Sequence, residues 1–352
     1  MSKLLLVLVS SVFCFAASAP TGNGTFALYG NSSVANTCLN GNIVNPTSSL
    51  SYSFPSTWSA NQSVPALQVV QKCSWLVTIP KGHFAKLIVN GQVTKLSLID
   101  SAGNVDQAIN DTSAPYYFTA PKFSIALSNS NSNATFAFQV VWAPIPSINE
   151  NQFVNFTAIV KDVSSNSTGF TVGSGSRVSI LPVPSNPYNP ISLRSVVAFQ
   201  GESTNDQFIN NMYRIYQSGE QLASNGQAIT IVNLESSNSS DVVVIQDFRY
   251  TKDIHEYKSF ECAANSTCSV IVNSGSRSSA AVSVGNSTEL LSSVRMDSNA
   301  SLTVYYGATS DACKVAHFPA NKLQELLPLT FSSNCTQYVV SSGKASLQIF
   351  KL

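Results

Sequence analysis

The sequence has few charged side chains and few histidines, and both shortages narrow the classes of function. Charged residues make up 11% of the 352 residues, and only three histidines occur. Such a composition excludes a basic surface for nucleic acid and gives no electrostatic case for binding an acidic membrane. We therefore expect no nucleic-acid partner and a surface covered mainly by serine, threonine and asparagine.

Short catalytic motifs are missing as well. The zinc pattern His-Glu-x-x-His fails after His255 and Glu256 because Ser259 stands at its last position. A Gly-x-Ser-x-Gly elbow, a phosphate-binding glycine loop and a Cys-x-x-Cys metal spacing are absent. Asp253 and His255 would share one face of a strand, but the charges around them favour a solvated edge strand. We expect no enzyme and no metal site, with a divergent hydrolase using this region as an alternative.

Residues 1–19 have the composition of a secretory signal peptide. Lys3 precedes an apolar run over residues 4–15, and small residues from Ala16 to Ala19 mark the cleavage region. The run is too short for a transmembrane span, and 347–352 is too short and polar for a lipid-anchor signal. Cleavage would leave 18 basic and 18 acidic residues. The sequence thus predicts a secreted, extracellular product without a transmembrane segment, in preference to an amphipathic or core helix at this end.

Cysteine usage agrees with export. Cys14 leaves with the leader, and an even number of cysteines then suits an oxidising compartment. These residues are Cys38, Cys73, Cys262, Cys268, Cys313 and Cys335. Six cysteines allow 15 pairings, and the long gap between the second and third favours pairing within each end. We expect neighbours in order to pair: Cys38 with Cys73, Cys262 with Cys268, and Cys313 with Cys335.

Asparagine glycosylation sequons occur along the whole chain. They begin at Asn23, Asn31, Asn61, Asn110, Asn133, Asn155, Asn166, Asn238, Asn265, Asn286, Asn299 and Asn334. A sequence rich in serine and asparagine produces many sequons by chance, so we expect about half of these asparagines to carry no glycan. Occupied sites must lie on the surface, and their spread favours localised recognition by loops over a broad protein interface.

Alternating apolar residues predict strands through residues 20–147. The stretch 73–91 is interpreted as two strands folded about Pro80-Lys81-Gly82, with Trp75 in the first. Trp75 and Trp142 alternate with polar neighbours, which places both in a core. Pro144 and Pro146 mark a domain boundary, and no helix is needed before it.

Four ordered motifs in this part resemble one known family. They are Cys73-Ser-Trp-Leu-Val-Thr-Ile-Pro-Lys-Gly-His-Phe-Ala-Lys-Leu-Ile-Val, Ile99-Asp-Ser-Ala-Gly-Asn, Ala114-Pro-Tyr-Tyr-Phe and Ala137-Phe-Gln-Val-Val-Trp. Together they resemble the nematode CUB-like domain of secreted proteins, over roughly residues 30–147. The resemblance implies a two-sheet jelly-roll sandwich, export, frequent association with intestinal responses to infection, and no catalytic activity.

The resemblance also raises the question of calcium. Ordinary CUB domains often bind calcium through acidic residues on one loop edge. Only Asp100, Asn104 and Asp106 stand near such a position here, without the usual companion tyrosine and glutamate. We expect no cofactor, and calcium stays an unsupported alternative.

Beyond residue 147 the chain contains echoes of itself. Residues 172–179 and 272–279 share Val-x-Ser-Gly-Ser-Arg-x-Ser, and Ile79-Pro-Lys-Gly82 is a looser third copy. Residues 228–246 also repeat the strand, turn and strand pattern of 123–139. These echoes either mark a degenerate second CUB-like module or arise by chance among serine-rich strands.

Two short segments have helical spacing. Phe208, Met212 and Ile215 predict a helix within residues 207–216, and residues 323–327 predict one short turn before a proline. The chain therefore divides into a signal peptide (1–19), a CUB-like domain (20–147) and a β-rich region (148–352). We predict an all-β protein: a CUB-like jelly-roll β-sandwich followed by a second β-rich sandwich region with little helix.

Aromatic residues in loops are the remaining candidates for binding. Trp58 lies in a loop-like stretch, and Tyr116 and Tyr117 follow a proline. From these residues and the resemblance we predict a secreted, glycosylated protein that binds extracellular glycan or protein ligands in innate immune defence. The alternative is a structural or coat glycoprotein without a discrete ligand.

Overall fold

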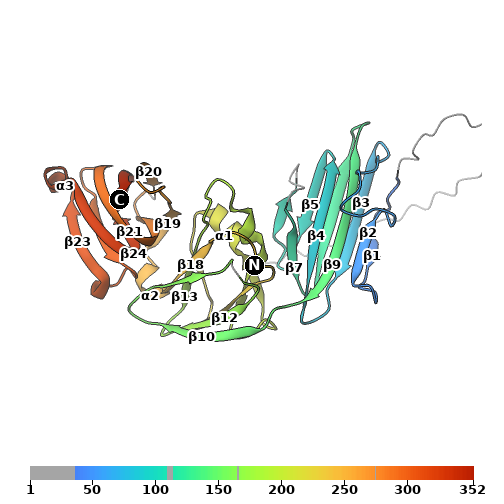
Figure 1. The fold of residues 1–352 in the computed structure, drawn as a ribbon, viewed down its shortest axis with the longest axis horizontal. Coiled ribbons are helices and arrows are strands. Elements are labelled where there is room, and N and C mark those ends of the chain that lie inside the picture. Colours follow the sequence, from blue (N-terminus) through green and yellow to red (C-terminus); the bar gives the residue numbers. More distant parts are fainter. Residues whose placement is uncertain (1–35, 109–113, 165, 274) are drawn as a thin grey trace, which may run out of the picture. The chain divides into compact units, whose positions relative to one another are not determined.

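The strands of the protein form three consecutive groups (Figure 1). The computed structural model describes residues 36–108, 114–164, 166–273 and 275–352. These residues belong to one unit of backbone contacts. Strands greatly outnumber helices along the described chain, which confirms the predicted all-β class with little helix.

The first strand group is a two-sheet sandwich. One sheet has the order β1-β3-β8-β5-β6 and the other β2-β9-β4-β7. Its strands are β1 (Asn42–Val44), β2 (Ser51–Phe54), β3 (Gln71–Thr78), β4 (His83–Gln92), β5 (Lys95–Ile99), β6 (Val105–Gln107), β7 (Tyr116–Thr119), β8 (Lys122–Asn129) and β9 (Thr135–Pro144). Trp75 of β3 and Phe138 of β9 meet edge to face between the sheets, with ring centroids 5.1 Å apart. Trp75 and Trp142 are both buried, as their alternation predicts.

Strands β3 and β4 do not form the expected hairpin, because they belong to different sheets. The chain between them arches over the end of the sandwich, and Gly82 has a φ of +77° that glycine adopts without strain. Alternation shows which residues face the core but not which strand pairs with which. A hairpin of β3 and β4 and a connection between two sheets therefore fit the pattern equally well. The Trp142 Nε1–H donates to the Thr78 carbonyl at 2.9 Å and ties one sheet to the other.

The second strand group repeats the first, strand for strand. Its sheets have the orders β10-β12-β17-β14-β15 and β11-β18-β13-β16, so every label is shifted by nine. The parallel pair β1 and β3 has its counterpart in the parallel pair β10 and β12. The strands are β10 (Ile148–Val154), β11 (Ile159–Asp162), β12 (Gly169–Ser174), β13 (Val178–Val183), β14 (Val196–Gln200), β15 (Phe208–Asn211), β16 (Leu222–Ala223), β17 (Ala228–Asn233) and β18 (Val242–Asp247). A core of its own fills the space between these sheets.

Short helices flank the second group. They are η1 (Pro190–Ser195), α1 (Met212–Ser218) and α2 (Phe248–Thr251). The helix predicted within 207–216 begins only at Met212, because Phe208 belongs to β15. The Asn211 side chain caps α1, and Gly219 ends it with a φ of +67°.

The third strand group follows the same path with two changes. Its strands are β19 (Ile254–Ser259), β20 (Ser266–Asn273), β21 (Ser278–Met296), β22 (Ser301–Tyr306), β23 (Lys314–Pro319), β24 (Leu329–Val340) and β25 (Lys344–Lys351), with η2 (Asp311–Cys313) and α3 (Ala320–Leu326). The order β19-β21-β24-β22-β23 matches β1-β3-β8-β5-β6, and β19 again runs parallel to its neighbour. The long β21 corresponds to β3 and β4 joined into one strand, and Gly285 within it has a φ of +129°. The long β24 likewise corresponds to β7 and β8 together, because its first residues pair with the second half of β21 as β7 pairs with β4. Helix α3, near the predicted short turn, precedes it.

The strand order shows which of the two internal sequence similarities joins equivalent strands. Residues 228–246 span β17 and β18, the counterparts of β8 and β9, so their likeness to 123–139 joins equivalent strands. Residues 172–179 join β12 to β13, whereas 272–279 join β20 to β21, which is a different step in the path. The shared Val-x-Ser-Gly-Ser-Arg-x-Ser motif therefore does not mark equivalent positions. The looser copy, Ile79–Gly82, does lie in the equivalent connection, from β3 to β4, but Ile79 there has the position of Ser174 and not that of Val172.

Candidate functional site

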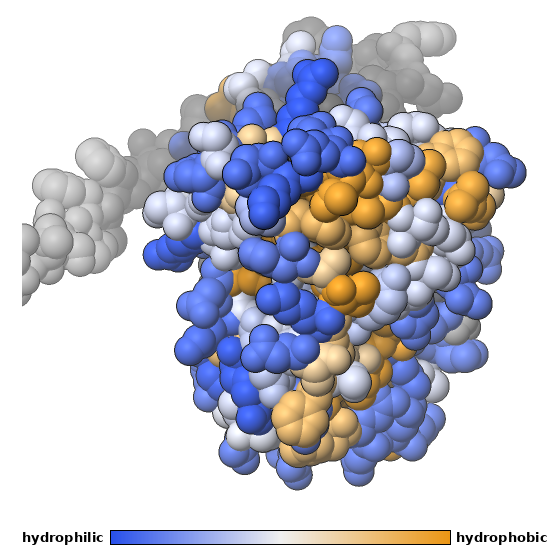
Figure 2. All heavy atoms as spheres, turned by 90° about the vertical axis from the view of Figure 1, so that its left-hand side faces the viewer, coloured by the Kyte–Doolittle hydropathy of each residue, from blue (hydrophilic) through white to orange (hydrophobic). Residues whose placement is uncertain are grey.

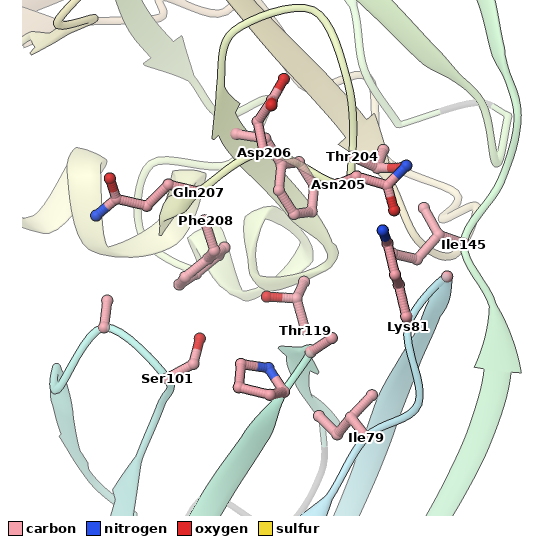
Figure 3. A pocket seen from close by; sticks show the side chains of 15 residues that line it. Ile79, Lys81, Ser101, Thr119, Ile145, Thr204, Asn205, Asp206, Gln207 and Phe208 are labelled. Atoms are coloured by element: carbon pink, nitrogen blue, oxygen red, sulfur yellow. The ribbon is translucent and has the colours of Figure 1, made fainter.

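A cavity of about 450 Å³ lies where turns of the first strand group meet the loop between β14 and β15 (Figure 3). The turn after β3 contributes Lys81, the turn after β5 contributes Ser101, and the end of β7 contributes Thr119. The second group supplies residues 204–208 and Phe199. This volume falls within the range of roughly 300–1,000 Å³ that small-molecule sites occupy.

Backbone hydrogen bonds hold the turns of the first group in place. The Ile79 amide donates to the Pro121 carbonyl at 2.8 Å, which joins the turn after β3 to the turn after β7. The Ile145 amide donates to the Gly82 carbonyl at 2.9 Å and fixes the chain leaving β9. One wall of the cavity is thus built from backbone that is tied on both sides.

The opposite wall is a loop that bonds to itself. The Ser203 amide donates to Asp206 Oδ2 at 2.9 Å, and the Asp206 amide donates to the Ser203 carbonyl at 3.1 Å. Gly201 has a φ of +100°, and a Cβ there would lie 2.7 Å from Asp206 Oδ2. The Asp206 carboxylate is engaged in shaping this loop, and Figure 3 shows it pointing away from Thr119 and Phe208.

The floor of the cavity is apolar. Phe199 and Phe208 are almost fully buried and meet edge to face, with centroids 6.1 Å apart. They belong to a hydrophobic cluster that also contains Phe84 of β4. The two strand groups therefore share apolar side chains beneath the cavity.

Two polar groups at the cavity lack partners among the described residues. Thr119 is 4% exposed, and its buried Oγ1 has no hydrogen-bond partner there. A buried hydroxyl without a partner costs about 1–3 kcal/mol, so it favours a site that something else completes. Lys81 is exposed, and no ion pair or hydrogen bond of its ammonium occurs in the described part of the chain. Its side chain points toward Asn205 across the cavity mouth (Figure 3).

Arg214 of α1 joins the two groups beside this cavity. Its Nε and Nη2 donate to Asp106 at 2.8 and 2.6 Å, and its Nη1 donates to Asp100. Asp100 also accepts from the Ala102 amide at 3.0 Å and the Asn104 amide at 2.9 Å. Burial disfavours the charged guanidinium, but the two carboxylates outweigh it and raise the pKa of Arg214.

The residues considered for calcium thus lie together, with an arginine guanidinium against their carboxylates. The sequence did not indicate this partner, because Arg214 lies more than 100 residues away from them. Among the described residues, no group of three or more His, Cys, Asp or Glu side chains could hold a metal ion.

The aromatic residues predicted to bind ligand lie elsewhere. Trp58 is 5% exposed, and its Nε1–H donates to the Gln62 carbonyl at 3.4 Å. Tyr116 is also 5% exposed and has the Arg194 guanidinium 4.1 Å from its ring centroid. The Tyr117 hydroxyl donates to Glu235, and burial, followed by that carboxylate, raises the pKa of Tyr117. A ligand role for these three residues stays a prediction.

Other hollows of the surface provide weaker candidates. His255 and Asp253 line an open polar cavity of about 720 Å³ beside β19, a strand whose single partner among the described residues is β21. On the side of β23 and α3, Figure 2 shows apolar side chains gathered among hydrophilic ones, and Val315 and Leu326 are exposed there. A further cavity beside α3 is lined by Arg295 and Gln324, among others. Within the described chain, no residue lining this cavity or the one beside β19 has a buried polar atom without a partner.

Two of the three expected disulfides are formed. Cys38 is bonded to Cys73, and Cys262 to Cys268. The third expected bridge is corrected, because Cys313 and Cys335 are separate thiols. Cysteine order indicates which residues are close in sequence but not whether their Cβ atoms face each other. The Cys313 thiol instead donates to the Phe156 carbonyl at 3.4 Å, while Cys335 is buried in β24.

All sequon asparagines within the described residues are exposed. They are Asn61, Asn133, Asn155, Asn166, Asn238, Asn265, Asn286, Asn299 and Asn334. Asn23, Asn31 and Asn110, like the predicted signal peptide, lie outside the described residues. In the described part of the chain, no helix is long and apolar enough to cross a membrane.

Comparison with solved structures gives distant likenesses. The CUB1-EGF-CUB2 domains of rat MASP-1 are 7% identical, with 58% of this chain and 99% of that chain covered and a TM-score of 0.22. The full extracellular region of zebrafish Gpr126/Adgrg6 is 8% identical, with 90% and 52% covered and a TM-score of 0.25. A triple jelly-roll protein of an archaeal virus is 9% identical, with 90% and 97% covered and a TM-score of 0.23. Scores this low carry no functional argument.

Family comparisons divide the chain along the strand groups. Residues 152–234 and 249–351 each match a domain of unknown function, DUF7592 and DUF7591. Comparison with curated proteins found no match. Residues 33–146 match the family described as CUB-like domain. This part of the chain is therefore similar to a CUB-like domain, and it contains the two-sheet sandwich of β1–β9.

Proposed function

We propose that the protein is a secreted, glycosylated binding protein whose extracellular ligand enters the cavity between the first two strand groups. The observation that carries this proposal is the buried Thr119 hydroxyl, which faces the cavity without a partner among the described residues. An apolar floor with a few polar groups at its rim is the usual composition of a small-ligand site. A glycan chain end has the size and mixed polarity that suit it.

Export and glycosylation have independent support. Two disulfides are formed, as suits an oxidising compartment. The exposed sequons are all open to modification where the structure describes them. The role in innate immune defence and the nematode origin rest on the resemblance of roughly residues 30–147 to the nematode CUB-like domain of secreted proteins. We propose no catalytic role.

We also propose that the region 148–352 holds two further modules of CUB-like topology. The support is the shared strand order, including the parallel first pair in every group. Each group has a core of its own, and smaller clusters join neighbouring groups. The binding cavity would then belong to a junction between modules, and the later modules are free to diverge.

A glycan and microbial-surface panel, run with and without a calcium chelator, tests the binding role. Ala102→Trp would fill the cavity from an exposed turn, and Ser132→Trp is the matched control. Ser132 lies beyond the far end of β8, and the eight residues of this strand separate it from the cavity by about 26 Å. We expect binding by the natural protein and by Ser132→Trp, and its loss in Ala102→Trp. Absence of binding to every panel member would contradict the proposal and favour a coat glycoprotein.

A further inference from the structure

Where the structure describes it, the cavity wall contains one cationic side chain, Lys81, and one anionic side chain, Asp206, and the two are oriented differently. The Lys81 ammonium points across the mouth toward Asn205, while the Asp206 carboxylate is bonded within its own loop and points away (Figure 3). The nearby carboxylates of Asp100 and Asp106 both bind Arg214, whose guanidinium balances one of their two negative charges. A ligand in the cavity therefore meets the Lys81 ammonium, whereas the Asp206 carboxylate is directed away from it.

The remaining surfaces specify the body of the ligand. Phe208 and Pro121 offer apolar surface, which complements the C–H face of a saturated ring. Thr119 and Asn205 offer hydroxyl and amide groups, which suit ring hydroxyls. An ammonium forms its strongest hydrogen bonds with a carboxylate or a phosphate.

Resting on the proposed binding role, we infer that this cavity takes a carboxylated sugar of the hexuronic acid class. The carboxylate pairs with Lys81, the ring lies against Phe208, and a ring hydroxyl satisfies Thr119 Oγ1. Because Lys81 is exposed, the charge contribution weakens as ionic strength rises.

Calorimetric titration with D-glucuronate and with its methyl ester isolates the charge, because the two sugars differ only there. We expect the acid to bind about tenfold more tightly than the ester at low salt, since charged hydrogen bonds are the stronger kind. Lys81→Gln should abolish that preference. Lys95→Gln, an exposed lysine at the opposite end of β5, should preserve it.

Thr119→Val removes the unpaired hydroxyl with little change of shape. It should weaken acid and ester equally, by several-fold, and leave the ligand-free protein as stable as before or more stable. If Thr119 had only a structural role, Thr119→Val would instead lower the stability of the ligand-free protein and leave the affinities for acid and ester unchanged.

The outcomes separate this inference from the broader proposal. Equal binding of acid and ester, or a preference that survives Lys81→Gln, would overturn the acidic ligand while leaving the cavity as a binding site. No binding of either sugar to the natural protein would overturn the inference outright. In that case the panel with Ala102→Trp still decides the binding role by itself.

Discussion

Replacing Arg214 tests whether the second strand group stabilises the first. Arg214→Met removes the guanidinium that pairs with Asp100 and Asp106, whose side chains are 5% and 22% exposed. Breaking a buried ion pair costs about 3–5 kcal/mol, because a buried charge is left alone. Partial exposure of Asp106 lowers the expected loss to about 2–4 kcal/mol of unfolding free energy of the first group.

Tryptophan fluorescence reads out this loss selectively. The three tryptophans, Trp58, Trp75 and Trp142, all belong to the first group, so their emission follows its unfolding alone. With a urea slope of about 1.5–2 kcal/mol/M, the midpoint should fall by roughly 1–2.7 M. Lys161→Met, which breaks an exposed ion pair within the second group, should leave the midpoint unchanged. An unchanged midpoint in Arg214→Met would refute the coupling.

Three further outcomes follow from individual contacts. Burial raises the pKa of Glu289, so its charge opposes folding when the pH lies above the unfolded-state pKa of about 4.3. Glu289→Gln should therefore slow hydrogen exchange in β24 at pH 7 but not at pH 4, and equal effects at the two pH values would contradict this. Burial raises the pKa of the Cys335 thiol to about 12, so maleimide should label Cys313 first and Cys335 only after unfolding; an unreduced, unfolded protein that takes no label would reveal a third disulfide. Trp142→Phe removes the hydrogen bond to the Thr78 carbonyl and should cost about 1–3 kcal/mol in urea unfolding, and a smaller loss would mean that the bond contributes little.

Local pattern carried much of the architecture. Alternation placed Trp75 and Trp142 in the core, and cysteine order gave two disulfides. Pattern could not decide which strands pair, because period-two alternation specifies a face and not a neighbour. The expected hairpin of β3 and β4 was wrong for that reason.

The cavity could not be predicted from the sequence, for a different reason. Its walls come from Lys81, Thr119 and residues 204–208, which only tertiary folding brings together. The unsatisfied state of the Thr119 hydroxyl is likewise a property of its surroundings and not of its type. Loop aromatics such as Trp58 were the visible signal, yet the structure buries that side chain.

The most direct test of the account is methyl NMR of isoleucine-labelled protein during a titration with D-glucuronate. Ile79 and Ile145 line the cavity, whereas Ile43 and Ile271 are exposed elsewhere. If the sugar binds in the cavity, the Ile79 and Ile145 methyl signals should shift saturably with one shared dissociation constant, and the Ile43 and Ile271 signals should not shift. Shifts confined to Ile43 or Ile271, or no shift at the cavity methyls up to saturating sugar, would contradict it.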